Sequence, residues 1–139
     1  MNDNYYHIYF NDNKEEIKRN NINEDDYVPK IKIIIDNQVT SFEGLFSFCK
    51  CIESIYFKNF YRNNIINMSR MFSFCVSLKE INLSNFNTIN VKNMNEMFDE
   101  CRSLKEVDLS KFNTGNVLDM SNMFDQCNSL KKLNFSNMK

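Results

Sequence analysis

The sequence predicts an α/β repeat fold, a curved leucine-rich-repeat solenoid with parallel strands on its concave face and short helices on its convex face. Three observations lead to this prediction. Apolar residues recur every 26 positions, one half of each repeat alternates with a period of two, and the other half has helical spacing. A period of 26 falls within the range of about 20–29 residues that leucine-rich repeats use.

The 26-residue period is clearest in three segments that begin at Met68, Met94 and Met120. Each of them reads Met-x-x-Met-Phe-x-x-Cys-x-Ser-Leu. A degenerate earlier copy keeps the same phase at Phe42, Leu45, Phe46, Cys49 and Ile52. Since one such unit cannot bury its own apolar side chains, we expect neighbouring units to stack and share a core.

The two halves of a unit predict different elements. Leu78, Ile81 and Leu83 form a Leu-x-x-Ile-x-Leu frame, whose last two members alternate as a half-buried strand requires. In the other half the apolar residues have spacings of three and four, which predict a helix of about three turns. These residues are Val91, Met94, Met97, Phe98 and Cys101. Glycine and proline are scarce, so we expect asparagine to form the turns.

We expect two parts in the chain. Residues 1–41 are predicted to form an N-terminal cap that includes a shortened first repeat, with strands at residues 5–10 and at Ile31, Ile33 and Ile35. The charged stretch at 11–26 predicts a loop or a short helix. Residues 42–139 are predicted to hold four 26-residue repeats, the last of them incomplete. The open C-terminal end suggests either a fragment or an end that pairs with a partner or with a second copy of the chain.

Composition limits the possible functions. The net charge is −1 with 25% charged residues, so no overall charge favours nucleic acid or an anionic membrane. The N-terminus lacks the basic and apolar regions of a secretory signal. No apolar run approaches the roughly 20 residues that span a bilayer. The compartment therefore stays open, and no nucleic-acid binding and no membrane insertion are expected.

The sequence offers no constellation for catalysis, and no cofactor is expected. His7 is the single histidine, and the two glycines, Gly44 and Gly115, cannot build a glycine-rich phosphate loop. Four cysteines form a ladder with a spacing of 26, at Cys49, Cys75, Cys101 and Cys127. Core packing is the favoured explanation. Disulfides between stacked units and a metal site are the alternatives.

The outward positions of the predicted strands are the candidate binding residues. In the Leu-x-x-Leu-x-Leu frame they form a column that is acidic in its middle, and the selected members are Tyr56, Glu80, Asn82, Glu106, Asp108 and Lys132. Tyr56 is the aromatic side chain there, of the kind that dominates binding energy at interfaces. Lys79, Lys105 and Lys131 form a basic column beside it.

The full motif of residues 68–91 resembles the BspA-like leucine-rich repeat family. It reads Met-x-x-Met-Phe-x-x-Cys-x-Ser-Leu-x-x-hydrophobic-x-Leu-Ser-x-Phe-Asn-Thr-x-Asn-Val, and the resemblance covers residues 42–139. Members of that family are typically surface or secreted proteins that adhere to host proteins or to other cells. The resemblance therefore implies adhesion.

These observations together predict a non-enzymatic protein–protein recognition module that binds through the concave strand face. The alternative is a structural spacer or stalk within a longer repeat array. An enzyme is a distant third.

Overall fold

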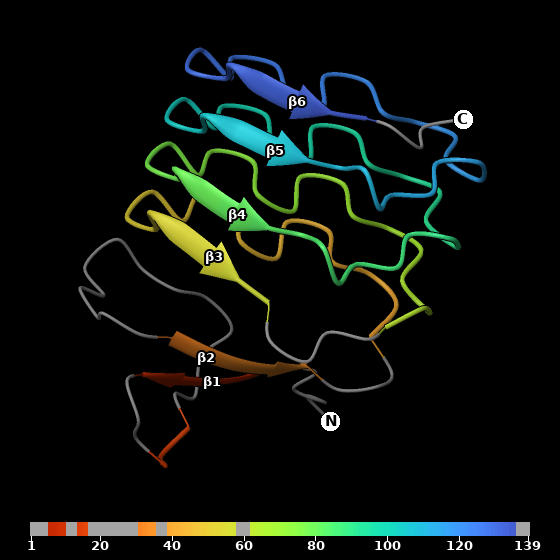
Figure 1. The fold of residues 1–139 in the computed structure, drawn as a ribbon. Helices are drawn as coiled ribbons and strands as arrows, with labels where there is room; N and C mark the ends of the chain where they lie inside the picture. The colour runs from red at the N-terminus through yellow and green to blue at the C-terminus, as the bar shows by residue number, and fades with distance from the viewer. Residues whose placement is uncertain (1–5, 11–13, 17–30, 36–38, 58–61, 136–139) are drawn as a thin grey trace. The chain divides into compact units, whose positions relative to one another are not determined.

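The computed structural model describes residues 6–10, 14–16, 31–35, 39–57 and 62–135 (Figure 1). The chain divides into two compact units, Met1–Val39 and Thr40–Lys139. Most of the charged stretch at 11–26 lies outside the described residues, as does the end of the last repeat at 136–139.

The first unit contains an antiparallel pair of strands. β1 spans Tyr6–Phe10 and β2 spans Ile31–Ile35, with Tyr6 opposite Ile35 and Phe10 opposite Ile31. Both strands were expected from the sequence. The ammonium group of Lys32 lies 5.4 Å from the centre of the Tyr9 ring, a cation–π contact across the pair.

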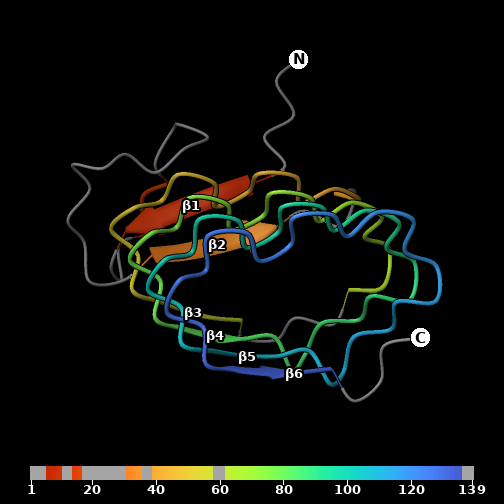
Figure 2. The same cartoon turned by 90° about the horizontal axis from the view of Figure 1, so that it is seen from above.

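The second unit is a stack of similar coils, each with one three-residue strand. The strands are β3 (Ser54–Tyr56), β4 (Glu80–Asn82), β5 (Glu106–Asp108) and β6 (Lys132–Asn134). β3 pairs with β4 and β5 pairs with β6, both in parallel, and β4 also contacts β5. Figure 1 shows the four strands side by side, and Figure 2 shows the coils overlying one another.

The expected fold class is wrong. The described residues contain no helix, so the predicted leucine-rich-repeat solenoid with helices on its convex face is not what this sequence forms. The strands form short parallel pairs, and the remainder of the second unit consists of turns and coil.

Overlapping β-turns occupy the segment predicted as a helix. The N–H groups of Met97, Asp99 and Cys101 each donate to the carbonyl three residues earlier, not four as in an α-helix. Glu96 and Glu100 have φ values of 53° and 60°, so they lie in the left-handed region that a type II turn requires at its third residue. The segment is therefore a ribbon of turns.

The remaining N–H groups of the ribbon join successive coils. Those of Met94, Glu96, Phe98 and Glu100 donate to carbonyl oxygens 25 residues further along the chain, at 2.9 Å in each case. Equivalent bonds link the two preceding pairs of coils. Alternate N–H groups thus either close a turn or bridge to the next coil. In this way the backbone forms its hydrogen bonds without a helix or a long strand.

The helix prediction failed because a helix and a turn ribbon bury apolar side chains at nearly the same sequence spacing. Every second turn starts and ends with an inward side chain, as in Met94–Met97 and Phe98–Cys101, which gives spacings of three and four residues in a period of four. Over eight residues this pattern cannot be distinguished from the helical period of 3.6. Met94, Met97, Phe98 and Cys101 are all fully buried, as either structure would have them.

A column of stacked phenylalanine rings runs through the core of the second unit. Ring centres are 5.6 Å apart for Phe46 and Phe72, 5.2 Å for Phe72 and Phe98, and 5.3 Å for Phe98 and Phe124. The paired rings are within 14° of parallel. One residue from each coil therefore contributes to a continuous aromatic stack.

Asparagine forms turns as expected, through side-chain acceptors. The Oδ1 atoms of Asn67 and Asn93 each accept a hydrogen bond from the N–H two residues later, at 2.9 Å. The same bond occurs at Asn82, Asn87, Asp108, Asn113 and Asp119. Such Asx-turns fix the chain direction at a corner without glycine.

Candidate functional site

The outward residues of β3 to β6 form an exposed face, here called the strand face. It consists of Ser54, Tyr56, Glu80, Asn82, Glu106, Asp108, Lys132 and Asn134. All six candidate binding residues predicted from the sequence belong to it. Their backbones pair along the strands while their side chains point away from the core, so they are not needed for packing.

Tyr56 is the most prominent side chain of the strand face. It is 66% exposed, and its hydroxyl donates a hydrogen bond of 2.7 Å to Oε2 of Glu80 on the neighbouring strand. This hydrogen bond and the negative charge of Glu80 raise the pKa of the Tyr56 hydroxyl. The bond holds the ring in one place, so little side-chain entropy remains to be lost on binding.

The charges of the strand face differ between its two ends. Lys132 lies opposite Glu106, with Nζ 3.5 Å from Oε2, but both side chains are more than two-thirds exposed, so the pair contributes little stability. The Ser110 hydroxyl and N–H donate to Asp108 and, with Asn134 and Lys132, lower its pKa. The carboxylate of Asp108 thus stays charged and available to a partner.

The neighbouring basic column is partly neutralised. Lys79 forms an ion pair with Glu53, with 2.9 Å between Nζ and Oε2. Lys105 and Lys131 are exposed, and within the described part of the chain no ion pair involves their side chains. The free positive charges therefore lie beside Glu106 and Asp108.

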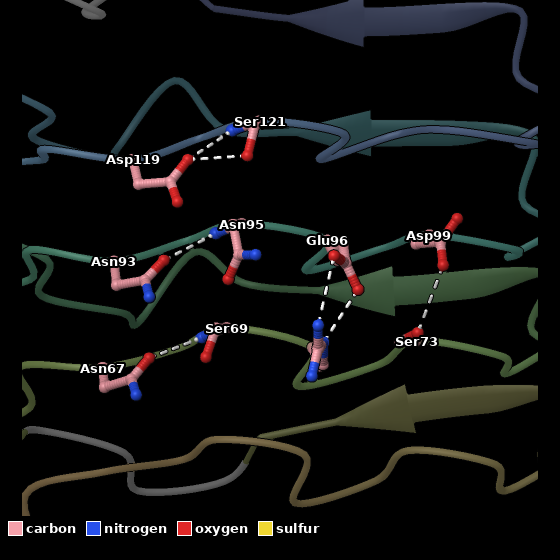
Figure 3. Close-up of polar contacts among 10 residues, drawn as sticks. Asn67, Ser69, Ser73, Asn93, Asn95, Glu96, Asp99, Asp119 and Ser121 are labelled. Carbon is pink, nitrogen blue, oxygen red and sulfur yellow. Dashed lines mark hydrogen bonds and ion pairs between the residues drawn. The ribbon is translucent and has the colours of Figure 1, made fainter.

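A second polar surface lies on the turn ribbons, and the sequence analysis missed it. Arg70 donates two hydrogen bonds to Glu96, at 2.7 Å from Nε and 3.3 Å from Nη2, and Ser73 donates to Asp99 at 3.5 Å. Figure 3 shows these contacts together with the Asx-turns of Asn67, Asn93 and Asp119. The sequence did contain a signal for this ion pair, because Arg70 and Glu96 are 26 residues apart and so occupy equivalent positions in neighbouring coils.

The charged form of Asp99 is disfavoured on this surface. Burial, followed by the charges of Glu100, Glu96 and Asp125, raises its pKa, although the Ser73 hydroxyl opposes the shift. The native state therefore binds more protons than the unfolded state between the ordinary Asp pKa, about 4, and the raised value. Stability falls as pH rises through this window.

The Asp99→Asn variant is expected to be more stable than the parent at pH 7, by less than about 1 kcal/mol because the carboxylate is only partly buried. The advantage should vanish below about pH 4, where Asp99 is protonated in both states. Thermal melts across pH measure it. Asp108→Asn is the matched control with a lowered pKa, and it should lose stability at pH 7. A pH-independent gain at Asp99 would contradict the electrostatic cause.

Three cysteines of the ladder, Cys49, Cys75 and Cys101, are buried in the core, and Cys127 is half-buried. The thiols of Cys75, Cys101 and Cys127 donate to carbonyl oxygens 29 residues earlier, at 3.0 to 3.1 Å. All five cysteines are free, and Cys51 alone is exposed. Among the described residues no group of three or more His, Cys, Asp or Glu side chains could hold a metal ion.

We expect burial to lower the reactivity of the ladder thiols. Burial raises the pKa of Cys49 and of Cys127 to about 11 and raises those of Cys75 and Cys101 further. Because the thiolate is the nucleophile, we expect iodoacetamide at pH 8 to modify Cys51 and spare the other four thiols. Peptide mass spectrometry before and after unfolding in urea measures this. Alkylation of Cys101 at the rate of Cys51 would contradict the buried ladder.

The described residues 40–57 and 62–135 define a class of repeat protein in which turn ribbons and three-residue strands stack at a period of 26 residues. The chain belongs to the family described as "Mycoplasma protein of unknown function, DUF285", whose model matches residues 37–139. No curated protein and no solved structure matches the chain. Among the described residues there is no helix long and apolar enough to cross a membrane.

Proposed function

We propose that this chain is a non-catalytic protein-recognition module that binds its partner through the strand face. The observation that carries the proposal is Tyr56, a large aromatic side chain that is 66% exposed and fixed by its hydrogen bond to Glu80. Tyrosines are enriched among the residues that contribute most of the binding energy in protein interfaces.

Charge on the strand face would orient the partner. Glu80, Glu106 and Asp108 provide negative charge, and Lys105, Lys131 and Lys132 provide positive charge beside it. Complementary charge mainly increases the association rate and excludes wrong partners. We therefore expect a protein partner with an apolar contact for Tyr56 and separate basic and acidic patches. The resemblance to BspA-like repeats supports adhesion as the biological role.

The test is a pull-down from cell and host-surface lysates with the parent chain and a Tyr56→Ala/Glu106→Lys/Asp108→Lys variant. A matched control carries Ile66→Ala, Glu43→Lys and Asp125→Lys, which change the net charge equally on other exposed positions. Circular dichroism checks that each fold is intact. Affinity should fall at least about tenfold in the first variant and stay unchanged in the control.

The outcome also decides between this proposal and the spacer alternative. A partner that is retained equally by both variants would remove the strand face as the binding surface. If no partner is captured by the parent chain, a structural spacer within a longer repeat array becomes the better explanation.

A further inference from the structure

Two phenylalanine rings stack on the outside of the turn ribbons. Phe48 and Phe74 occupy equivalent positions in neighbouring coils, with ring centres 4.6 Å apart and ring planes within 8° of parallel. Phe48 is 57% exposed and Phe74 is half-buried, so the pair lies outside the core. Single exposed apolar side chains are ordinary on a protein surface, whereas contiguous apolar surface is a feature of interaction sites.

The turn geometry does not require phenylalanine at these two positions. Phe48 and Phe74 have φ values of 62° and 60°, in the left-handed region that is costly for a bulky side chain. The equivalent residues of the next two coils are Glu100 and Gln126, at φ 60° and 54°. Since the ribbon accepts hydrophilic residues there, its own folding does not account for an exposed aromatic pair.

Carboxylates continue the same surface into the next two coils. The N–H of Phe74 donates to the carbonyl of Asp99 at 2.8 Å, and the N–H of Glu100 donates to the carbonyl of Asp125 at 2.9 Å. Figure 3 shows Glu96 and Asp99 along one coil, with Ser73 of the preceding coil bonded to Asp99. We call this area the ribbon surface, and it consists of Phe48, Phe74, Glu96, Asp99, Glu100 and Asp125.

The ribbon surface carries more negative than positive charge. Arginines pair with Glu96 and Glu100, at 2.7 Å and 2.5 Å between nitrogen and oxygen. In the described part of the chain no ion pair involves Asp99 or Asp125. Burial and then the charges of the three neighbouring carboxylates raise the pKa of Asp99. A cation beside Asp99 would therefore relieve repulsion that is present in the native state.

We infer that the ribbon surface docks a basic segment of a partner protein, with an apolar side chain on the Phe48–Phe74 pair and lysine or arginine side chains against Asp99 and Asp125. Charge complementarity selects this occupant, because an acidic segment would be repelled and an uncharged one would leave the carboxylates without a cation.

The length of the ribbon surface suits an extended segment. Asp125 lies three coils beyond Phe48, so the two are about 14 Å apart at the roughly 4.8 Å spacing of neighbouring strands. Four or five extended residues, at about 3.3 Å each, span that distance. The ribbon surface and the strand face share no residue, so this inference does not depend on the proposed function.

The probe is the peptide Phe-Ser-Lys-Ser-Lys with blocked ends, whose phenylalanine and lysine side chains share one face when it is extended. It is titrated into the isotope-labelled chain, and binding is followed by amide chemical shifts in NMR spectra. We expect saturable shifts at Phe48, Phe74, Asp99 and Asp125, with a Kd of about 1 mM or below at low salt. High salt should weaken the binding, because it screens exposed charges.

Two control peptides test the two halves of the inference separately. Phe-Ser-Glu-Ser-Glu keeps the ring and reverses the charge, and Ser-Ser-Lys-Ser-Lys keeps the charge and removes the ring. Each should bind at least about fivefold more weakly than the probe. Equal binding of the first would exclude charge recognition, and equal binding of the second would exclude a role for the aromatic pair, so either result would overturn the inference.

A variant of the chain locates the contact. Phe48→Ala/Asp99→Asn/Asp125→Asn removes one exposed ring and two carboxylates and should weaken probe binding by at least about tenfold. Asparagine keeps a side-chain oxygen for the hydrogen bonds that Asp99 accepts from Ser73 and Asp125 accepts from the N–H of Gln126. Circular dichroism checks the fold, and Asp99→Asn/Asp125→Asn, with both rings in place, serves if the triple variant does not fold.

The matched control is Tyr56→Ala/Glu106→Gln/Asp108→Asn, which removes the same groups from the strand face and should bind the probe as the parent does. The pair of variants also separates this inference from the strand-face proposal, because each removes one surface and leaves the other intact. Absence of shifts at about 5 mM peptide, or equal weakening in the two triple variants, would overturn the inference.

Discussion

The Phe98→Ala variant is expected to lose about 3–5 kcal/mol of unfolding free energy. Phe98 is fully buried, and its ring stacks on Phe72 at 5.2 Å on one side and on Phe124 at 5.3 Å on the other. Truncation removes both contacts and leaves a cavity between coils whose spacing is fixed by backbone hydrogen bonds. The walls therefore cannot collapse into the space.

Urea unfolding followed by circular dichroism measures this loss. Phe48→Ala is the matched control, because the Phe48 ring also stacks, 4.6 Å from Phe74, but is 57% exposed. The control should lose less than about 1 kcal/mol, since most of its surface already contacts water. Equal losses in the two variants would show that the column through Phe98 is not the stabilising core.

The Thr88→Val variant is expected to lose about 2 kcal/mol, because it leaves two backbone groups without partners. Thr88 is 1% exposed. Its hydroxyl donates to the carbonyl of Asn113 at 3.0 Å and accepts from the N–H of Asn113 at 2.7 Å. Valine has nearly the same shape but can do neither. The Thr88 hydroxyl thus joins neighbouring coils in place of a direct backbone–backbone hydrogen bond.

Thr88→Ser is the control that separates hydrogen bonding from packing. Serine keeps the hydroxyl and loses a methyl group, so its loss should be nearer 1 kcal/mol, about the value of one buried methylene. Thermal or urea unfolding of both variants gives the comparison. A serine variant less stable than the valine variant would show that the methyl group, and not the bridge to Asn113, is what the position needs.

The strands were predictable from the sequence. Period-two alternation around Ile81 and Val107 correctly indicated strands there, and the residues on either side of each were correctly expected to be exposed. This follows from strand geometry, in which successive side chains point to opposite faces. Whether the strand face binds a partner is a separate prediction that stays open.

The turn ribbons were not predictable by the same reasoning. Arg70, Phe74, Glu96 and Glu100 adopt positive φ, and no propensity rule assigns left-handed backbone to arginine, glutamate or phenylalanine. Gly44, at φ 61°, and Asn122, at φ 55°, are the positions where the residue type does indicate it. The hydrogen bonds between coils compensate for the strain, and they join residues about 25 positions apart that a local pattern does not connect.

The left-handed residues have a consequence for how individual coils acquire chemical identity. In successive coils the first of these positions holds Gly44, Arg70, Glu96 and Asn122, and the second holds Phe48, Phe74, Glu100 and Gln126. None of the eight is buried, while the inward positions between them scarcely change from coil to coil. Differences in residue type between coils are thereby concentrated at the positive-φ positions, whose side chains do not pack in the core. A duplicated coil can diverge there into a new combination of charge and ring while its framework stays constant.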